Sequence, residues 1–105
     1  MKRVVILFML FGFFSLSSCK NVDNEFVIRD PGGAISSAEL RLCGNRLNLT
    51  KFGSEMKGQM PITCEGEGSI LVRLVDGKET SCRIGYVTPS AEQTFEFVVE
   101  DRQCR

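Results

Sequence analysis

The alternation of apolar and polar residues beyond Ala38 constrains the fold of this chain more than any other feature. Ile70, Val72 and Leu74 occupy every second position, and Phe95 and Phe97 continue the same pattern later in the chain. A period of two places side chains on one face of a β-strand, whereas a helix requires a period near 3.6. No window after residue 20 has the helical period. We therefore predict an all-β domain, a small antiparallel β-sandwich or barrel.

The first 18 residues have the layout of a secretory signal. A cationic start, Met1-Lys2-Arg3, precedes an apolar run from Val4 to Phe14, and small or polar residues follow. The run is shorter than the roughly 20 residues that a membrane-spanning helix needs. We predict that residues 1–18 are a cleaved signal peptide and that the mature domain occupies an oxidising compartment.

The segment Leu16-Ser17-Ser18-Cys19 resembles the lipobox of bacterial lipoproteins. This resemblance implies cleavage before Cys19, acylation of that cysteine, palmitate included, and a membrane anchor through the lipid. The alternative is an ordinary signal peptide with a chance cysteine. Lys20 stands where an inner-membrane lipoprotein of enteric-type bacteria has aspartate, which implies an outer-membrane location with the domain facing the periplasm. The sorting rule does not apply in a Gram-positive host.

Residues 19–37 are expected to form the lipidated N-terminus and a tether, and residues 38–105 the β domain. The tether contains Pro31 and the Gly32-Gly33 pair, and only residues 26–28 are apolar enough for a short edge strand. An ordered part of the fold is the alternative for this stretch.

Four further cysteines, Cys43, Cys64, Cys82 and Cys104, predict two structural disulfides in an exported domain of this size. An up-and-down strand order would place the first two at one end of the sheet and the last two at the other. It therefore favours Cys43–Cys64 and Cys82–Cys104 among three pairings, although a Greek-key crossover would change this outcome. The spacing lacks close Cys-x-x-Cys pairs and the chain has no histidine, so we expect no metal site.

Turn residues predict where the strands are connected. Gly44-Asn45 resembles a tight turn, and residues 51–58 are expected to form a polar loop. Asp76-Gly77 resembles a two-residue hairpin turn, but that register would split the apolar face. A loop longer by one residue, with a bulge near Gly77, pairs Val72 with Cys82 and restores the face.

The mature composition argues against nucleic acid and against catalysis. Without Lys2 and Arg3 the chain has 11 basic and 13 acidic side chains, so it lacks the basic surface that nucleic acid requires. With no histidine, Ser-His and Cys-His nucleophile pairs cannot form. We expect no catalytic residues, no enzyme activity and no cofactor. Phe26, Tyr86, Phe95 and Phe97 are expected in the core.

The candidate partner-binding loop contains Glu65, Glu67 and Ser69, with Glu92 on a second loop at the same end of the sheet. Gly66 and Gly68 lie between the first three, and a flexible connection between strands is the alternative interpretation. In the up-and-down order, these loops converge with the Gly44-Asn45 turn. Rigid scaffolds commonly present recognition residues on such loops.

The run from Cys64 to Leu74 resembles one part of the membrane-bound inhibitors of C-type lysozyme. In that family a cysteine is followed by apolar residues at its sixth, eighth and tenth positions, as at Ile70, Val72 and Leu74. The Ser-Ala-Ser-Gly-type inhibitory loop and the tryptophan of the family are absent, so no inhibitory residue carries over. The resemblance implies a small lipid-anchored inhibitor.

Two functions fit these features. One is a periplasmic binding protein, an inhibitor or immunity protein, whose partner is a cell-wall-degrading enzyme and whose carboxylates assist docking on a cationic surface. The other is a non-catalytic accessory lipoprotein of an envelope assembly such as a secretion system. In both, the partners are the membrane, through the lipid, and another protein.

Overall fold

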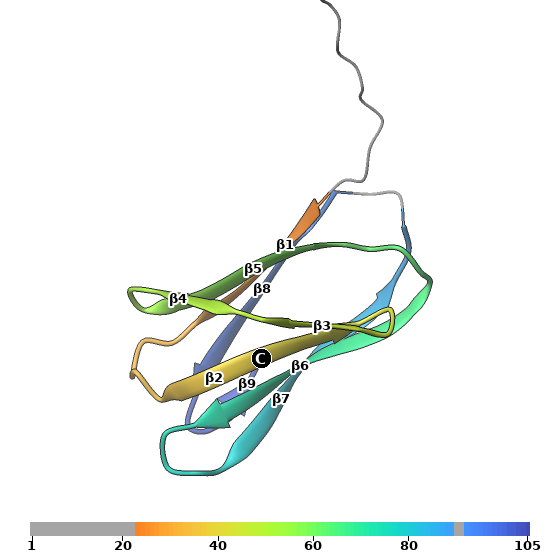
Figure 1. Ribbon diagram of the computed structural model, residues 1–105. Helices are drawn as coiled ribbons and strands as arrows, with labels where there is room; N and C mark the ends of the chain where they lie inside the picture. Colours follow the sequence, from red (N-terminus) through yellow and green to blue (C-terminus); the bar gives the residue numbers. More distant parts are fainter. Residues whose placement is uncertain (1–22, 90–91) are drawn as a thin grey trace, which may run out of the picture.

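The computed structural model describes residues 23–89 and 92–105, which form two β-sheets packed face to face (Figure 1). The predicted signal peptide 1–18 and lipid site Cys19 lie outside these ranges. No helix of the described ranges is long and apolar enough to cross a membrane. The described strands are β1 (Asp23–Arg29), β2 (Ile35–Leu42), β3 (Asn45–Asn48), β4 (Thr50–Phe52), β5 (Glu55–Pro61), β6 (Gly66–Leu74), β7 (Glu79–Val87), β8 (Thr94–Glu100) and β9 (Gln103–Cys104).

The architecture confirms the prediction of a small all-β sandwich. One sheet has the order β4-β5-β1-β8-β9 and the other has the order β3-β2-β6-β7. The described pairs are antiparallel except β1 and β8, which run parallel. Inward-facing apolar side chains of both sheets form a single core. The most buried of its hydrophobic members are Phe26, Ile28, Leu40, Ile70, Val72 and Cys82.

Residues 23–37, predicted as a tether, are instead strands and a fixed turn, so the alternative of an ordered segment holds. β1 lies between β5 and β8 in the middle of its sheet, and Phe26 is completely buried. Two polar residues of this stretch, Asn24 and Asp30, are themselves buried. The Asp30 carboxylate accepts hydrogen bonds from the backbone N–H groups of Ala34 (2.8 Å) and Ile35 (2.9 Å), which fixes the link to β2.

Both predicted disulfides are present, Cys43–Cys64 and Cys82–Cys104. The first joins the β2–β3 turn to the link between β5 and β6, and the second joins β7 to β9. The up-and-down order from which the pairing was predicted is wrong, because the consecutive strands β5 and β6 lie in different sheets and β2 lies beside β6. The second disulfide therefore connects the two sheets directly.

The β6–β7 hairpin differs from its predicted register by two residues. Val72 lies opposite Thr80 instead of Cys82. The loop is longer than two residues, as predicted, and Gly77 takes a left-handed backbone conformation, with φ at 91°. Because the two registers differ by an even number, the same side chains face the core in both, and the apolar pattern cannot distinguish them.

A second irregularity of this hairpin was not predicted. Gly68 lies opposite Gly85, but Ser69 lies opposite Arg83, so β7 contains one extra residue at this point. Gly85 has φ at 89°, a conformation that other residues rarely adopt. The bulge turns Tyr86 toward solvent, where it is 66% exposed, so its predicted place in the core is wrong.

Two predicted connections are also corrected. Residues 51–58, expected as a polar loop, contain strand residues of β4 and β5 joined by the two-residue turn Gly53–Ser54. The first tight turn is formed by Cys43 and Gly44, one residue earlier than expected, and both have positive φ angles of 55° and 75°. In both cases, pairing with a neighbouring strand determines the boundary, which the turn dipeptide alone does not specify.

We expect Phe26→Ala to lower the free energy of unfolding by about 3–5 kcal/mol, the usual cost of truncating a buried aromatic residue. Phe26 stacks on Phe95 across the parallel pair, with ring centroids 5.0 Å apart. The matched control is Phe52→Ala, since Phe52 is 59% exposed and its loss should cost about 0.5 kcal/mol or less. Urea unfolding followed by circular dichroism would measure both. Equal, small effects would contradict a central position for β1.

Candidate functional site

Three connecting segments gather at one end of the sandwich, here called the loop end (Figure 1). They are the Cys43–Gly44 turn, the link 62–65 between β5 and β6, and the described parts of the segment from Thr88 to Gln93. Cys43 and Cys64 are joined directly, and Gly66 pairs with Val87, so all three segments adjoin. The predicted convergence is confirmed. β1 also begins at the loop end, where Asp23 pairs with Pro61.

Glu65 stands at the entrance to β6 and is held by the aromatic residue that the sequence assigned to the core. The Tyr86 hydroxyl donates a hydrogen bond to Glu65 Oε1 at 2.8 Å. This carboxylate raises the pKa of Tyr86 above the ordinary value of 10.0, because it would face the phenolate, and partial desolvation acts in the same direction. The pair presents a carboxylate and an aromatic ring side by side on the surface.

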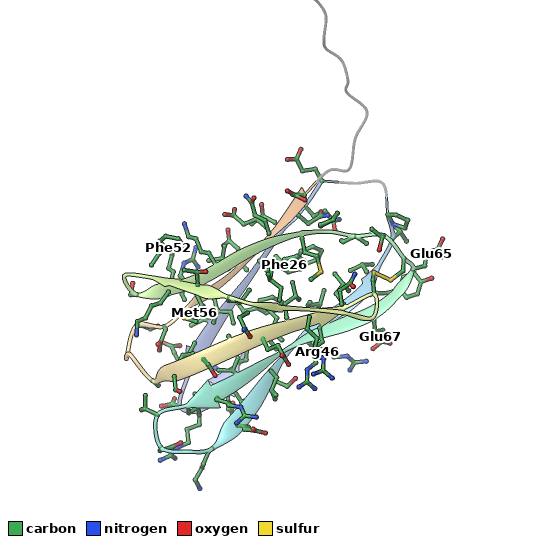
Figure 2. All side chains as sticks on the ribbon, viewed as in Figure 1. Phe26, Arg46, Phe52, Met56, Glu65 and Glu67 are labelled. Carbon is green, nitrogen blue, oxygen red and sulfur yellow. A yellow bond between two sulfur atoms is a disulfide. The ribbon has the colours of Figure 1, made fainter. Side chains whose placement is uncertain are left out.

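Glu67 and Ser69 lie within β6, so neither the predicted loop nor the flexible connection is correct from Gly66 onward. Alternation along β6 places Glu67 and Ser69 on the same outward face, and Glu65 reaches this face through its hydrogen bond with Tyr86, which lies opposite Glu67. The reason for Gly68 is close packing, since an added Cβ would lie 2.5 Å from Leu42 Cδ1. Glu67 forms an exposed ion pair with Arg83 at 3.4 Å. Figure 2 shows Glu65 and Glu67 projecting from this end of the sheet.

Glu92 belongs to the loop end but not to the same cluster. It is exposed and lies just before β8 of the five-stranded sheet, whereas Glu65 and Glu67 lie at the start of β6 in the other sheet. The backbone N–H of its neighbour Gln93 donates to Asn24 Oδ1 at 2.8 Å, which attaches this segment to β1. The structure therefore brings Glu65, Glu67 and Ser69 together on one face and leaves Glu92 apart.

The site exposes charged side chains to a partner, but its described residues form no group that could bind a metal ion. No group of three or more His, Cys, Asp or Glu side chains that could hold an ion occurs in the part of the chain that the structure describes. The ionisable neighbours that sequence reasoning missed are Arg41, Arg46 and Arg83, which line a depression beside Ser69. Each faces outward on a strand with alternating apolar and polar residues. The sequence shows this alternation, but only the strand register shows that the three arginines are neighbours.

Comparison of the chain with protein-family models, with curated proteins and with solved structures gives no match. The function is therefore inferred from the residues of this chain and their geometry.

We predict that Glu65→Gln lowers the pKa of Tyr86 toward 10.0, because the amide removes the negative charge that opposes phenolate formation. The hydrogen bond from the phenol is itself present below the pKa of Tyr86 and is lost as the pH rises through it. The chain has one tyrosine and no tryptophan, so ultraviolet absorbance at alkaline pH reports this group alone. Glu79→Gln, at the other end of β7, is the control and should leave the titration unchanged. An unaltered midpoint in Glu65→Gln would contradict the contact.

Proposed function

We propose that this protein is a lipid-anchored, non-catalytic binding protein of the bacterial envelope that docks on a cell-wall-degrading enzyme and inhibits it. The observation that carries the proposal is the cluster of Glu65, Glu67 and Tyr86 at the loop end, held on a disulfide-linked scaffold. A rigid scaffold loses little conformational entropy when it binds a partner. The lipobox-like segment at Cys19 supports a location in the bacterial envelope, where cell-wall-degrading enzymes act.

The chemistry of this cluster suits a cationic protein surface. Exposed carboxylates accelerate association with a positively charged partner and fix its orientation. Tyrosine is among the residues that contribute most to protein interfaces, and Tyr86 is already oriented by Glu65. A cationic hydrolase of the cell wall would meet both features, with Tyr86 as the apolar anchor and Glu65 and Glu67 as its polar border.

A second candidate, an accessory lipoprotein of an envelope assembly, is favoured by the place where β1 begins. Four residue steps separate Cys19 from Asp23, a span of at most about 14 Å. A lipid on Cys19 would therefore hold the loop end close to the membrane. A soluble enzyme would have to approach along the membrane plane, whereas a partner embedded in the membrane would meet this end directly.

The lipid anchor is tested on the precursor expressed in a bacterium with an outer membrane. The wild-type chain should incorporate an alkyne fatty acid, have Cys19 as its first mature residue by mass spectrometry, and fractionate with the outer membrane. Cys19→Ser should lose the label and the membrane fraction together. A mature wild-type chain that begins elsewhere and carries no label would contradict the anchor.

The binding function is tested with the oxidised mature chain against envelope extract and a panel of lysozymes and other cell-wall hydrolases. We expect a hydrolase to be captured and inhibited, and Glu65→Gln/Glu67→Gln to weaken inhibition about tenfold or more. The matched control is Glu79→Gln/Glu100→Gln. It removes two ion-paired glutamates that lie where β7 begins and β8 ends, away from the loop end. Capture of assembly components alone, unchanged by the first variant, would reject the inhibitor and support the accessory role.

A further inference from the structure

A row of three arginines crosses the outer face of the four-stranded sheet near the loop end. Arg46 of β3 lies opposite Arg41 of β2, Arg41 lies opposite Ser69 of β6, and Ser69 lies opposite Arg83 of β7. Neighbouring positions in such a row are about 4.8 Å apart at the backbone, within easy reach of long side chains. We call these four residues the arginine row.

The arginine row borders a surface depression of about 590 Å³. The Cys43–Gly44 turn forms one side of it, and Glu67 also contributes to the lining. Figure 2 shows Arg46 and Glu67 directed toward this side of the molecule. The depression is large enough for a small anionic group together with part of the molecule that carries it.

The charges of the arginine row are incompletely balanced. Arg41 and Arg46 are directly opposite each other, an arrangement of like charges that destabilises a strand pair. Arg41 contacts Glu39 at 2.7 Å and Arg83 contacts Glu67 at 3.4 Å, but Arg46 has no carboxylate within 4 Å in the described ranges. The row therefore has an excess of positive charge.

The ion pair between Arg83 and Glu67 is of a kind that an incoming anion can replace. The side chains of Arg83 and Glu67 are 79% and 62% exposed, and such pairs contribute little because water screens them. A hydrogen bond from Arg41 lowers the pKa of Glu39, and the charges of Arg41, Arg46 and Arg73 act in the same direction. The effect on this neighbouring carboxyl is consistent with a net positive potential on this face of the sheet.

We propose that the arginine row is a binding site for a phosphoryl group. Guanidinium groups bind phosphate oxygens through paired N–H donors, and a phosphoryl group offers enough oxygens to engage several arginines at once. The Ser69 hydroxyl, between Arg41 and Arg83, supplies one more donor. A bound dianion also offsets the repulsion between Arg41 and Arg46.

Two sources can present this group, a phospholipid headgroup or a soluble phosphorylated molecule. The headgroup source rests on the proposed lipid anchor, because the arginine row lies near the end at which β1 begins. The formal charge of the mature chain is slightly negative, so attraction of the whole molecule to an anionic bilayer would not imitate site-specific binding.

The test uses the oxidised chain from Lys20 to Arg105, since both disulfides and the described core lie within it. In one arm, inorganic phosphate or glycerol phosphate is titrated while the arginine Nε–H and Ser69 amide resonances are followed by NMR at constant ionic strength. In the other, the chain is sedimented with vesicles of phosphatidylcholine, with or without phosphatidylglycerol. Saturable shifts confined to the arginine row are expected in the first arm, and retention on the anionic vesicles identifies a headgroup source.

Variants separate the site from general electrostatics. Arg41→Gln and Arg83→Gln should each weaken binding about tenfold, whereas Glu67→Gln should strengthen it by removing the internal competitor. Arg73→Gln is the matched control, because Arg73 lies in the same sheet and pairs with Glu79 but does not line the depression.

Shifts without vesicle retention would support the site and assign a soluble source. Absence of saturable shifts together with absence of selective retention would overturn the proposal, as would equal weakening by Arg73→Gln. None of these outcomes bears on acylation of Cys19, which the labelling experiment decides separately.

Discussion

The insertion of β1 between β5 and β8 is the constraint on which the rest of the sandwich depends. β1 is antiparallel to β5 but parallel to β8, and a parallel pair cannot be closed by a tight hairpin. The connection between them is residues 30–93, which include the entire second sheet. The first sheet can therefore be completed only when strands 65 or more residues apart in sequence meet, which implies a high contact order and slow folding.

The path of the chain between the sheets explains how a domain this small maintains one core. β3 pairs with β2, whereas β4 pairs with β5 in the other sheet, and the chain changes sheets at the buried residue Leu49. The backbone N–H of Leu49 still donates to Ala38 of β2 at 2.9 Å. The Cys82–Cys104 disulfide adds a further link between the sheets, and Cys43–Cys64 ties the β2–β3 turn to the segment through which the chain passes from β5 to β6.

The sequence predicted the fold class and the disulfide pairing, although the strand order used for the pairing was wrong. The chain reverses direction at each turn, and β3 and β4 continue in one direction across Leu49, so the end at which each cysteine lies depends on the number of reversals and not on which strands are neighbours. Only residues 26–28 of β1 were predicted as a strand, because local sequence does not show that the nearby polar residues Asn24 and Asp30 accept hydrogen bonds from the backbone of a distant segment and of a turn. The bulge at Gly85 could not be predicted either. Its position depends on how β7 pairs with β6, which the local sequence does not specify.

The candidate site was predictable in part, and the reason shows how its two surfaces are connected. Glu65 and Glu67 were identified from local sequence, but Arg41, Arg46 and Arg83 meet only through the strand register. The proposed protein-binding cluster and the proposed phosphoryl site share one contact, the ion pair between Arg83 and Glu67. An anion that replaces Glu67 on Arg83 leaves this carboxylate free for a cationic partner. Because coupling between two sites is reciprocal, a partner that engages Glu67 would in turn strengthen anion binding at the arginine row.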